Sequence, residues 1–313
     1  MKERMSDVAR RSHGPGMKRS EALAGIALAT IAALPACAPT STGIVETKGS
    51  PLHPTTFGSQ LYPPDDIGQA VPLLAACGSK LLRVTANNTN FPYFDALFAA
   101  ATEHGMRVIL ISQYATQPVD LTAYAADAVA FHRRYAAHNP IWELWNEPNL
   151  AAYWLAPPDR NAYANLAIAT ATALRNAGAR EILSGGTSGI DVSWLYDLRL
   201  RGVFDVVTGC AVHSYKKPAQ ALNDYIQAMS LMPLGVDIYT TEACVVTSSG
   251  QSSFFQDMWY LHRYLSLPVL VWCEFRDGTA GPIAPYTDPM GLVTADYLPK
   301  DVYYTAQTLV TNA

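Results

Sequence analysis

The sequence predicts an α/β fold, a (β/α)8 TIM barrel in a single domain, and two observations support this prediction. Short apolar segments alternate with longer segments of helical character, and eight such pairs follow one another from residue 55 to the C-terminus. Alternation of this kind favours parallel βαβ units. Half of the 313 residues are hydrophobic and only 15% are charged, so the chain can bury one large core, and a barrel of about 250 residues needs no second domain.

Eight strands can be assigned, each followed by a helix. The pairs, strand first, are residues 55–59 and 67–77, 80–85 and 93–104, 107–113 and 121–137, 142–146 and 160–176, 181–184 and 194–200, 204–213 and 219–232, 237–242 and 253–265, and 269–274 and 301–310. The third strand reads Val-Ile-Leu-Ile, as a strand buried on both faces should. The fourth ends near Glu147, because Pro148 has no N–H to donate to a ladder. Gly105, Gly178 and Gly202 fall just after helices, where glycine commonly ends a helix.

The N-terminal region resembles a bacterial secretory leader. A basic pair precedes an apolar run of 15 residues, 22–36, which is shorter than the ~20 residues that span a bilayer and therefore predicts a signal segment. The motif Leu34-Pro35-Ala36-Cys37 resembles a lipobox, which implies a lipoprotein-type signal peptide over residues 1–37 and a lipid anchor at Cys37. A plain secreted protein is the alternative. Met17 is an alternative start, since residues 17–37 form a complete leader by themselves.

The leader and the composition together predict where the protein acts and what it does not bind. Residues 38–54 are rich in Thr, Ser, Gly and Pro and predict a flexible linker, so the barrel domain covers residues 55–313. We expect an exported monomer, either a periplasmic or cell-surface lipoprotein or a secreted protein, whose membrane contact is the lipid anchor alone. The net charge of −4 comes without a basic stripe, which excludes a nucleic-acid partner.

Polar residues gather at the predicted C-terminal ends of the strands, where barrel enzymes carry their catalytic groups. They are Arg83, Asn146, Glu147, His213, Tyr215, Glu242, Trp272 and Glu274. Glu147 and Glu242 end the fourth and seventh strands and would face each other across one pocket. Two such carboxyls predict glycosidic bond cleavage: about 5–5.5 Å separates them in retaining enzymes and roughly 6.5–9.5 Å in inverting ones. The sequence leaves this distance open.

These residues also carry a family resemblance. Trp145-Asn146-Glu147-Pro148-Asn149 resembles the acid/base motif of the clan A glycoside hydrolases, which are retaining (β/α)8 enzymes, and Tyr239-Thr240-Thr241-Glu242 resembles their nucleophile segment. The eighth-strand run over residues 271–278 and the closing Gly291-Leu292-Val293 are most similar to family thirty-nine and the related bacterial exopolysaccharide endoglycosidases. Many members append a β-sandwich, for which we expect no counterpart here, so their sugar specificity is not carried over.

The resemblance implies a role for each matching residue and requires no cofactor. Glu147 would be the acid and then the base, and Glu242 the nucleophile that forms a glycosyl-enzyme. The other implied roles are those of Arg83 as the contact of the nucleophile, Asn146 as the partner of the sugar 2-hydroxyl, His213 with Tyr215 as the pair on strand six, and Trp272 as the platform beneath the sugar. Arg83 and Tyr215 are expected to keep Glu242 ionised.

Three further side chains are less clearly assigned. Trp154 follows the fourth strand and is expected to be an aromatic residue near the cleft that binds substrate. Glu143 lies four residues before Glu147, and we expect it to form a buried structural pair with a neighbouring strand. Glu274 either lines the pocket and binds substrate or points out of the barrel.

Two other classes of function stay open as alternatives to a glycosidase acting on a carbohydrate substrate. One is a carbohydrate-binding lipoprotein on the same barrel without catalysis. The other is a metal-dependent hydrolase, but the sequence contains no His-Glu-x-x-His motif and no Cys pair at zinc spacing. We therefore expect no metal. The sugar, the linkage, and the choice between endo and exo cleavage are not encoded in any motif we recognise.

Overall fold

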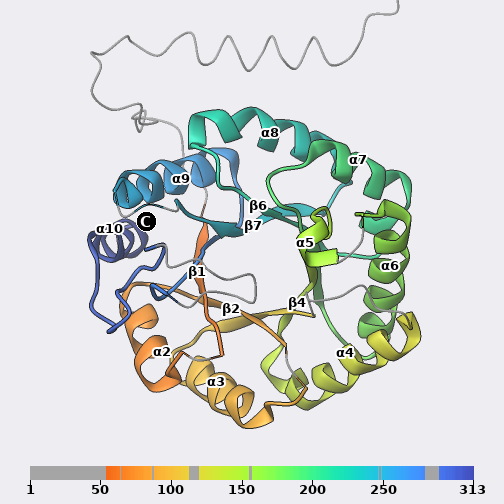
Figure 1. The fold of residues 1–313 in the computed structure, drawn as a ribbon, viewed down its shortest axis with the longest axis horizontal. Helices are drawn as coiled ribbons and strands as arrows, with labels where there is room; N and C mark the ends of the chain where they lie inside the picture. Colours follow the sequence, from red (N-terminus) through yellow and green to blue (C-terminus); the bar gives the residue numbers. More distant parts are fainter. Residues whose placement is uncertain are drawn as a thin grey trace, which may run out of the picture. The chain divides into compact units, whose positions relative to one another are not determined.

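The computed structural model describes residues 54–63, 65–86, 88–112, 120–154, 157–245, 247, 249–278 and 289–313. In these residues eight parallel strands close into a barrel in chain order, and helices surround it (Figure 1). The predicted (β/α)8 barrel is thereby confirmed. The predicted leader with its anchor at Cys37, and the linker up to residue 53, lie outside the described residues. None of the helices described is both long enough and apolar enough to cross a membrane.

The elements, in chain order, have the following bounds. They are β1 (Thr56–Gln60), α2 (Ile67–Ala76), β2 (Leu81–Thr85), α3 (Phe91–Glu103), β3 (Arg107–Ile111), α4 (Leu121–Tyr135), the 3-10 turn η1 (Ala136–His138), β4 (Ile141–Asn146), α5 (Ala151–Trp154), α6 (Arg160–Asn176), β5 (Glu181–Gly186), α7 (Val192–Leu200), the 3-10 turn η2 (Val203–Asp205), β6 (Gly209–His213), α8 (Pro218–Leu231), β7 (Asp237–Ala243), α9 (Gln251–Leu265), β8 (Val269–Trp272) and α10 (Asp301–Thr311).

Three elements differ from the prediction. The sixth strand begins at Gly209 instead of residue 204, because Val203 and Phe204 are buried in a 3-10 turn and so read as part of an apolar strand. The eighth strand ends at Trp272, which leaves Glu274 just beyond the sheet. The short helix α5 was not predicted. The predicted strand end at Gln113 lies outside the described residues.

Side-chain caps explain where several helices begin. Asp66, Asp120, Asp159 and Asp191 precede α2, α4, α6 and α7, and each carboxylate accepts hydrogen bonds from N–H groups of the first turn. These N–H groups have no partner within the helix, so the caps stabilise the helix starts, each by about 1 kcal/mol. At the other ends, the predicted glycines 105, 178 and 202 adopt the left-handed φ values of 63°, 99° and 77°, which confirms their role in ending helices.

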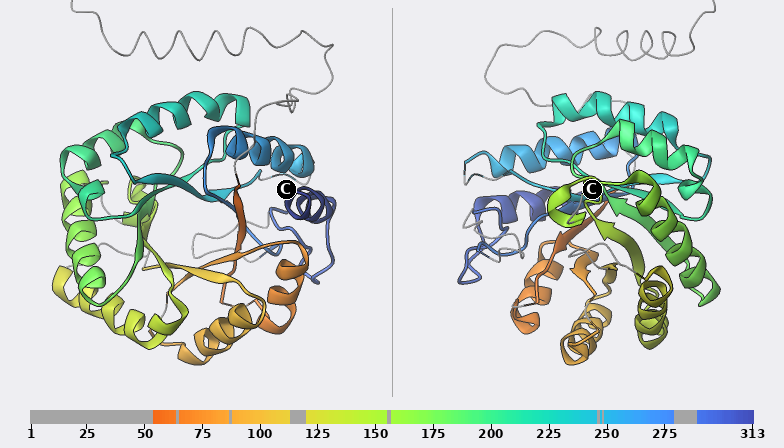
Figure 2. Two further views of the ribbon diagram at one scale, coloured as in Figure 1. Left: turned by 180° about the vertical axis from the view of Figure 1, so that it is seen from behind. Right: turned by 45° about the vertical axis from the view of Figure 1, so that its right-hand side comes forward.

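Apolar side chains pack on both sides of the sheet. The larger cluster lies between the strands and the helices, which surround the strands in the left view of Figure 2. A smaller cluster fills the barrel interior and consists of Leu81, Ile109, Ile141, Leu183, Ala211, Val269 and Val271, with Tyr239 against it. The interior is therefore a packed core up to this level, as in barrels of this type.

Charged side chains replace the apolar ones one step further along the strands. Residues two apart in a strand face the same side, and here Leu81 is followed by Arg83, Ile141 by Glu143, and Ala211 by His213. All three charged or titratable side chains are buried. The interior thus changes from apolar to ionic within one pleat, toward the C-terminal ends of the strands.

Two consecutive glycines let β5 approach its neighbours closely. A Cβ atom at Gly185 would lie 2.4 Å from the carbonyl oxygen of Leu144 and 2.8 Å from that of Trp145. A Cβ at Gly186 would lie 2.1 Å from His213 Nε2. Both positions therefore need glycine because other atoms approach so closely. Both lie beside the polar C-terminal end of β4.

This close approach predicts that Gly185→Ala is strongly destabilising. The added methyl group meets backbone oxygens, which cannot rotate away, so we expect a loss of about 3 kcal/mol or more in the free energy of unfolding, measured by urea denaturation. The control is Gly68→Ala in α2, where the new Cβ would contact only the Asp66 carboxylate at 3.3 Å; its effect should stay below about 1 kcal/mol. Equal stabilities of the two variants would show that β5 can move away from β4.

Candidate active site

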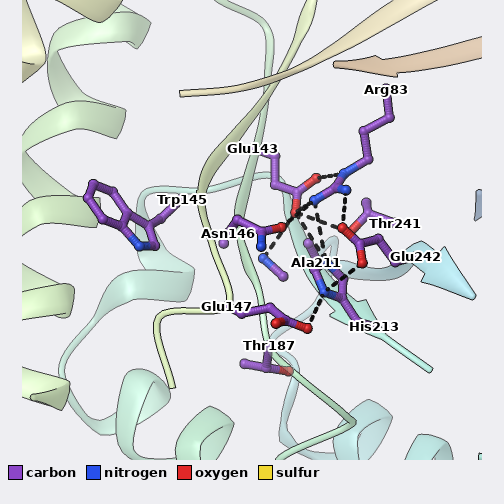
Figure 3. A network of polar contacts seen from close by, with 12 residues as sticks. Arg83, Glu143, Trp145, Asn146, Glu147, Thr187, Ala211, His213, Thr241 and Glu242 are labelled. Carbon is purple, nitrogen blue, oxygen red and sulfur yellow. Dashed lines mark hydrogen bonds and ion pairs between the residues drawn. The ribbon is translucent and has the colours of Figure 1, made fainter. Parts of the chain in front are cut away.

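Four strand ends deliver polar side chains to one place inside the barrel mouth. Arg83 comes from β2, Asn146 from the end of β4, Glu147 from the residue after it, His213 from β6 and Glu242 from β7. Figure 3 shows them in one network of hydrogen bonds and ion pairs. The structure therefore brings together these five predicted site residues.

The end of β4 has an unusual backbone that selects which side chains face inward. Trp145 and Glu147 have positive φ angles of 85° and 44°, which are rare for residues with side chains. Trp145 leaves the interior side and packs between Tyr124 and Trp154, at ring centroid distances of 5.8 and 5.3 Å, and it points away from the network in Figure 3. Asn146 then faces inward, where its Oδ1 accepts a hydrogen bond from Arg83 Nη2 at 3.0 Å.

The end of β7 contains an irregularity with a similar effect. The register of β7 shifts against both β6 and β8 near Thr240–Ala243. As a result two consecutive side chains reach the interior: Thr241 Oγ1 donates to Glu143 Oε1 at 3.2 Å, and Glu242 contacts Arg83 and Tyr215. Bulges next to active sites commonly redirect a side chain in this way.

The guanidinium of Arg83 is completely buried and contacts side chains from several strands. Its Nε and Nη2 donate to the two oxygens of Glu143 at 2.7 and 2.8 Å. Its Nη1 donates to Gln60 Oε1 at 2.6 Å and to Glu242 Oε1. A buried guanidinium is tolerated only when its charge and its donors are satisfied, and two carboxylates supply both here.

His213 lies between the two predicted catalytic carboxyls. Its Nδ1 is 3.0 Å from Glu147 Oε1 and 3.5 Å from Glu242 Oε2, while its Nε2 is 3.6 Å from Glu143 Oε1. Taken with His213, one carboxyl oxygen of Glu147 and one of Glu242 lie within 4.8 Å of each other. The two carboxyls therefore share one site, and each is slightly exposed to solvent.

Neighbouring charges make Glu242 an anion and His213 a cation at neutral pH. Burial raises the pKa of Glu242, but the charges of His213 and Arg83 and the hydrogen bond from Tyr215 outweigh burial, so the pKa lies below its usual value. Glu242 is thus ionised at neutral pH, as expected. Burial lowers the pKa of His213, but the charge of Glu242 and the hydrogen bonds with Glu143 and Glu147 raise it to about 9. The imidazole is therefore a cation at neutral pH.

Tyr215 contacts the site from its solvent side. Its hydroxyl donates to Glu242 Oε2, while 39% of the residue is exposed. Burial of the hydroxyl and the charge of Glu242 raise the pKa of Tyr215 well above its ordinary value, so the group remains a hydrogen-bond donor at any physiological pH. A ligand that entered the barrel mouth would meet this ring next to Glu242.

Two predicted substrate-binding aromatics lie elsewhere, which corrects the prediction. Trp272 is 1% exposed, packs against Phe254 and Phe255 of α9 and donates its Nε1 to the Met290 carbonyl at 2.8 Å. Strand alternation causes this, because Val271 faces the interior and its neighbour must face the helices. Trp154 is 0% exposed and supports Trp145 from behind, so it is a packing residue.

Other residues near the site were missed or only partly predicted. Glu143 is a buried pair residue, as expected, but its partner Arg83 lies on β2, two strands away, instead of on a neighbouring strand. Gln60 ends β1 and could have been found by the same strand-end rule. Tyr62 lies two residues further on; burial, and then neighbouring charges that include Glu242 and Glu274, raise its pKa. Glu274 itself is buried just after β8.

Glu147, His213 and Glu242 are also the one group found in the described residues with a spacing that could hold a metal ion. The surrounding groups do not fit that role. Arg83 and Tyr215 already donate to the two oxygens of Glu242, and the raised pKa of His213 keeps a proton where a metal would need a lone pair. We therefore assign this set to proton chemistry.

A cavity of about 560 Å³ lies next to the loop that follows Glu147. Its lining is largely polar and includes Asn149, two residues after Glu147, together with Asp159, Asn161 and Asp191. Asn149 connects the two loops above β4 and β5, because its side chain hydrogen-bonds both backbone groups of Ser188. The cavity therefore lies beside the loops that follow β4 and β5.

The raised pKa of His213 predicts a pH dependence of stability. Its folded-state pKa is about 9 against an ordinary 6.5, so its contribution is fully present below pH 6.5 and is lost as the pH rises through 9. The Tm of the wild type should therefore fall between these values by roughly 5 °C more than that of His213→Gln, as measured by calorimetry. Parallel Tm curves for the two proteins would show that His213 is not protonated in the fold.

Comparison with protein-family models and with curated protein sequences gives no match. Among solved structures, the chain is similar to a family 39 glycoside hydrolase from Bacteroides cellulosilyticus, with a TM-score of 0.66 and 17% identity over 83% of this chain and 64% of that one. It is also similar to a monomeric beta-xylosidase from Caulobacter crescentus, with a TM-score of 0.65 and 16% identity over 82% and 68% of the two chains. A family 39 enzyme from Xanthomonas axonopodis pv. citri gives a TM-score of 0.65 and 16% identity over 83% and 66%.

The chain spans about two thirds of the length of these structures. At such low identities the likeness concerns the fold, and it agrees with the resemblance carried by the motifs around Glu147 and Glu242. The chain thus has the barrel fold that is also found in family 39 glycoside hydrolases.

Proposed function

We propose that this protein is a retaining glycoside hydrolase, which cleaves O-glycosidic bonds of an oligo- or polysaccharide by double displacement. The observation that carries the proposal is the pair of carboxyls at the ends of β4 and β7, with an oxygen of Glu147 and an oxygen of Glu242 within 4.8 Å of each other. This separation supports the retaining mechanism, which needs about 5–5.5 Å, over the inverting one, which needs roughly 6.5–9.5 Å.

Glu242 has the properties of the nucleophile. It is ionised because Arg83 and His213 compensate its charge, and Tyr215 orients its second oxygen. In the first step, a Glu242 oxygen bonds to the anomeric carbon while the bond from that carbon to the leaving oxygen breaks. The electron pair of the broken bond stays on the leaving oxygen, which takes the proton of Glu147.

Glu147 then acts as the base of the second step. Its carboxylate accepts a proton from water, the water oxygen bonds to the anomeric carbon, and Glu242 leaves with the electron pair of its ester bond. The hydrogen bond from His213 Nδ1 at 3.0 Å stabilises the carboxylate form that this step requires. Both carboxyls return to their starting protonation states.

The substrate class is supported by the surroundings of the pair. A sugar bound at Glu242 would meet the partly exposed ring and the hydroxyl of Tyr215. Similar structures include a beta-xylosidase and an endoxylanase, which are both carbohydrate-active enzymes. The leader-like N-terminal segment adds the proposal that the protein acts outside the cytoplasm, as a lipoprotein anchored at Cys37 or as a secreted protein.

Substitution of the two carboxyls tests the mechanism. On a panel of aryl glycosides and oligosaccharides, Glu242→Gln should lower kcat by about 10⁴-fold or more, because the covalent step loses its nucleophile. Glu147→Gln should lower kcat by about 10²- to 10⁴-fold, because the second step loses its base. The value of kcat/KM, which reports the first step, should fall less on substrates with activated leaving groups, which need no proton. The matched control is Glu103→Gln, an exposed residue at the end of α3, which should keep wild-type activity.

The alternatives give different results in the same experiment. Near wild-type activity of Glu242→Gln would show that the nucleophile is wrongly assigned. A wild-type protein that binds an oligosaccharide but releases no product would favour the carbohydrate-binding alternative. Loss of activity with a chelator would favour the metal-dependent hydrolase.

A further inference from the structure

Glu143 is the third carboxylate of the site, and the mechanism above gives it no role. It lies within β4 with no exposed surface, so no substrate can reach it. Its Oε2 accepts a hydrogen bond from Arg83 Nε at 2.7 Å, and its Oε1 accepts from Arg83 Nη2 at 2.8 Å. Oε1 also accepts from Gly186 N at 3.1 Å and from Thr241 Oγ1 at 3.2 Å. Three other strands therefore hold this carboxylate in one orientation.

The bidentate contact determines how Arg83 presents its remaining donors. Because a guanidinium is planar and rigid, fixing Nε and Nη2 on Glu143 also fixes the direction of Nη1. Nη1 donates to Glu242 Oε1 and to Gln60 Oε1, and Nη2 also donates to Asn146 Oδ1 at 3.0 Å. The position of the proposed nucleophile therefore depends on Glu143 through a single rigid group.

Glu143 is also connected to the two proposed catalytic carboxyls through His213. Its Nε2 lies 3.6 Å from Glu143 Oε1, and its Nδ1 faces Glu147 and Glu242 at 3.0 and 3.5 Å. Among the described residues, the charged or titratable groups that face this ring are Glu143, Glu147, Glu242, Arg83 and Tyr215. From β5 the ring lies against Gly186, and the backbone N–H of His213 donates to the Thr187 carbonyl just after that strand.

The charges of the site move during the proposed reaction, but that of Glu143 does not. When Glu242 forms the ester with the sugar it becomes neutral, and at the same time Glu147 gives up its proton and becomes negative. Arg83 then loses one of its two carboxylate partners. Glu143 is the partner that remains, since it takes part in no bond-making step and Arg83 holds its pKa down at about 2 against the effect of burial.

We propose that Glu143 is a positioning residue that orients Arg83 and His213, and through them the nucleophile and the acid/base, during both steps of the reaction. The proposal rests on the function proposed above. It predicts that the negative charge of Glu143, and not only its shape, matters to the site. Glu143→Gln keeps the shape and removes the charge, so it separates the two contributions.

The first test needs no substrate, so its outcome is independent of the proposed function. The pKa of His213 is measured by NMR on histidine-labelled protein, with the signal assigned by comparison with His213→Gln. Removing the charge 3.6 Å from Nε2 should lower this pKa by about one unit or more in Glu143→Gln. The matched control is Glu181→Gln, which removes the carboxylate of another Glu–Arg pair, with Arg107, at the opposite end of the barrel; the His213 pKa should not change.

The second test measures activity. With an aryl glycoside that the wild type hydrolyses, Glu143→Gln should lower kcat by about tenfold or more and change KM little, because Glu143 does not touch substrate. The alkaline limb of its pH–rate profile should move to lower pH, because a negative charge near both titrating groups is lost. A purely structural role would lower stability and leave the profile in place.

Glu143→Asp completes the series, and it serves as the main variant if Glu143→Gln does not fold. It retains the charge but is too short to hold both Arg83 donors, so the pKa of His213 should stay close to the wild-type value while kcat falls. An unchanged His213 pKa in Glu143→Gln, or a wild-type kcat in Glu143→Asp, would overturn the proposal. If no substrate is hydrolysed by the wild type but the pKa shift is found, the proposed function fails and the electrostatic coupling stands.

Discussion

The site depends on one buried guanidinium. Arg83 carries a positive charge into the barrel interior, at the level where the apolar packing of Leu81 and Ile109 ends. A charge in that position is stable only with compensating partners, and breaking a buried ion pair costs about 3–5 kcal/mol. Glu143 and Glu242 compensate it from β4 and β7, the two strands that also carry the proposed catalytic groups. The ion pair that compensates the charge of Arg83 therefore also holds the proposed nucleophile, Glu242, in place.

The remaining charges follow from this arrangement. His213 lies next to three carboxyl groups and is held as a cation, and this cation lies within 3.5 Å of an oxygen of both Glu147 and Glu242. When Glu242 becomes neutral and Glu147 becomes negative during the reaction, the negative charge therefore stays next to the same imidazole. The backbone supports the arrangement through Gly186, which provides space for the His213 ring.

Much of the fold and part of the site could be predicted from the sequence. Strand and helix alternation predicted the barrel, and the polar residues at strand ends predicted that Arg83, His213 and Glu242 would meet. The aromatic predictions failed for a definite reason: the alternation that directs Val271 inward directs Trp272 outward. At Trp145 the positive φ, and in β7 the register shift, change which side chains face the pocket. Such backbone irregularities leave no pattern in the sequence, and the partner of Glu143 depends on distances across the barrel.

The stereochemistry of hydrolysis tests the central claim most directly. The anomeric proton of the first sugar released can be followed by ¹H NMR immediately after enzyme is added to a hydrolysed glycoside, before mutarotation. Two carboxyls with oxygens within 4.8 Å of each other predict that this sugar has the same anomeric configuration as the bond that was cleaved. Inverted configuration would contradict the account, because it would mean that water, and not Glu242, attacks the anomeric carbon.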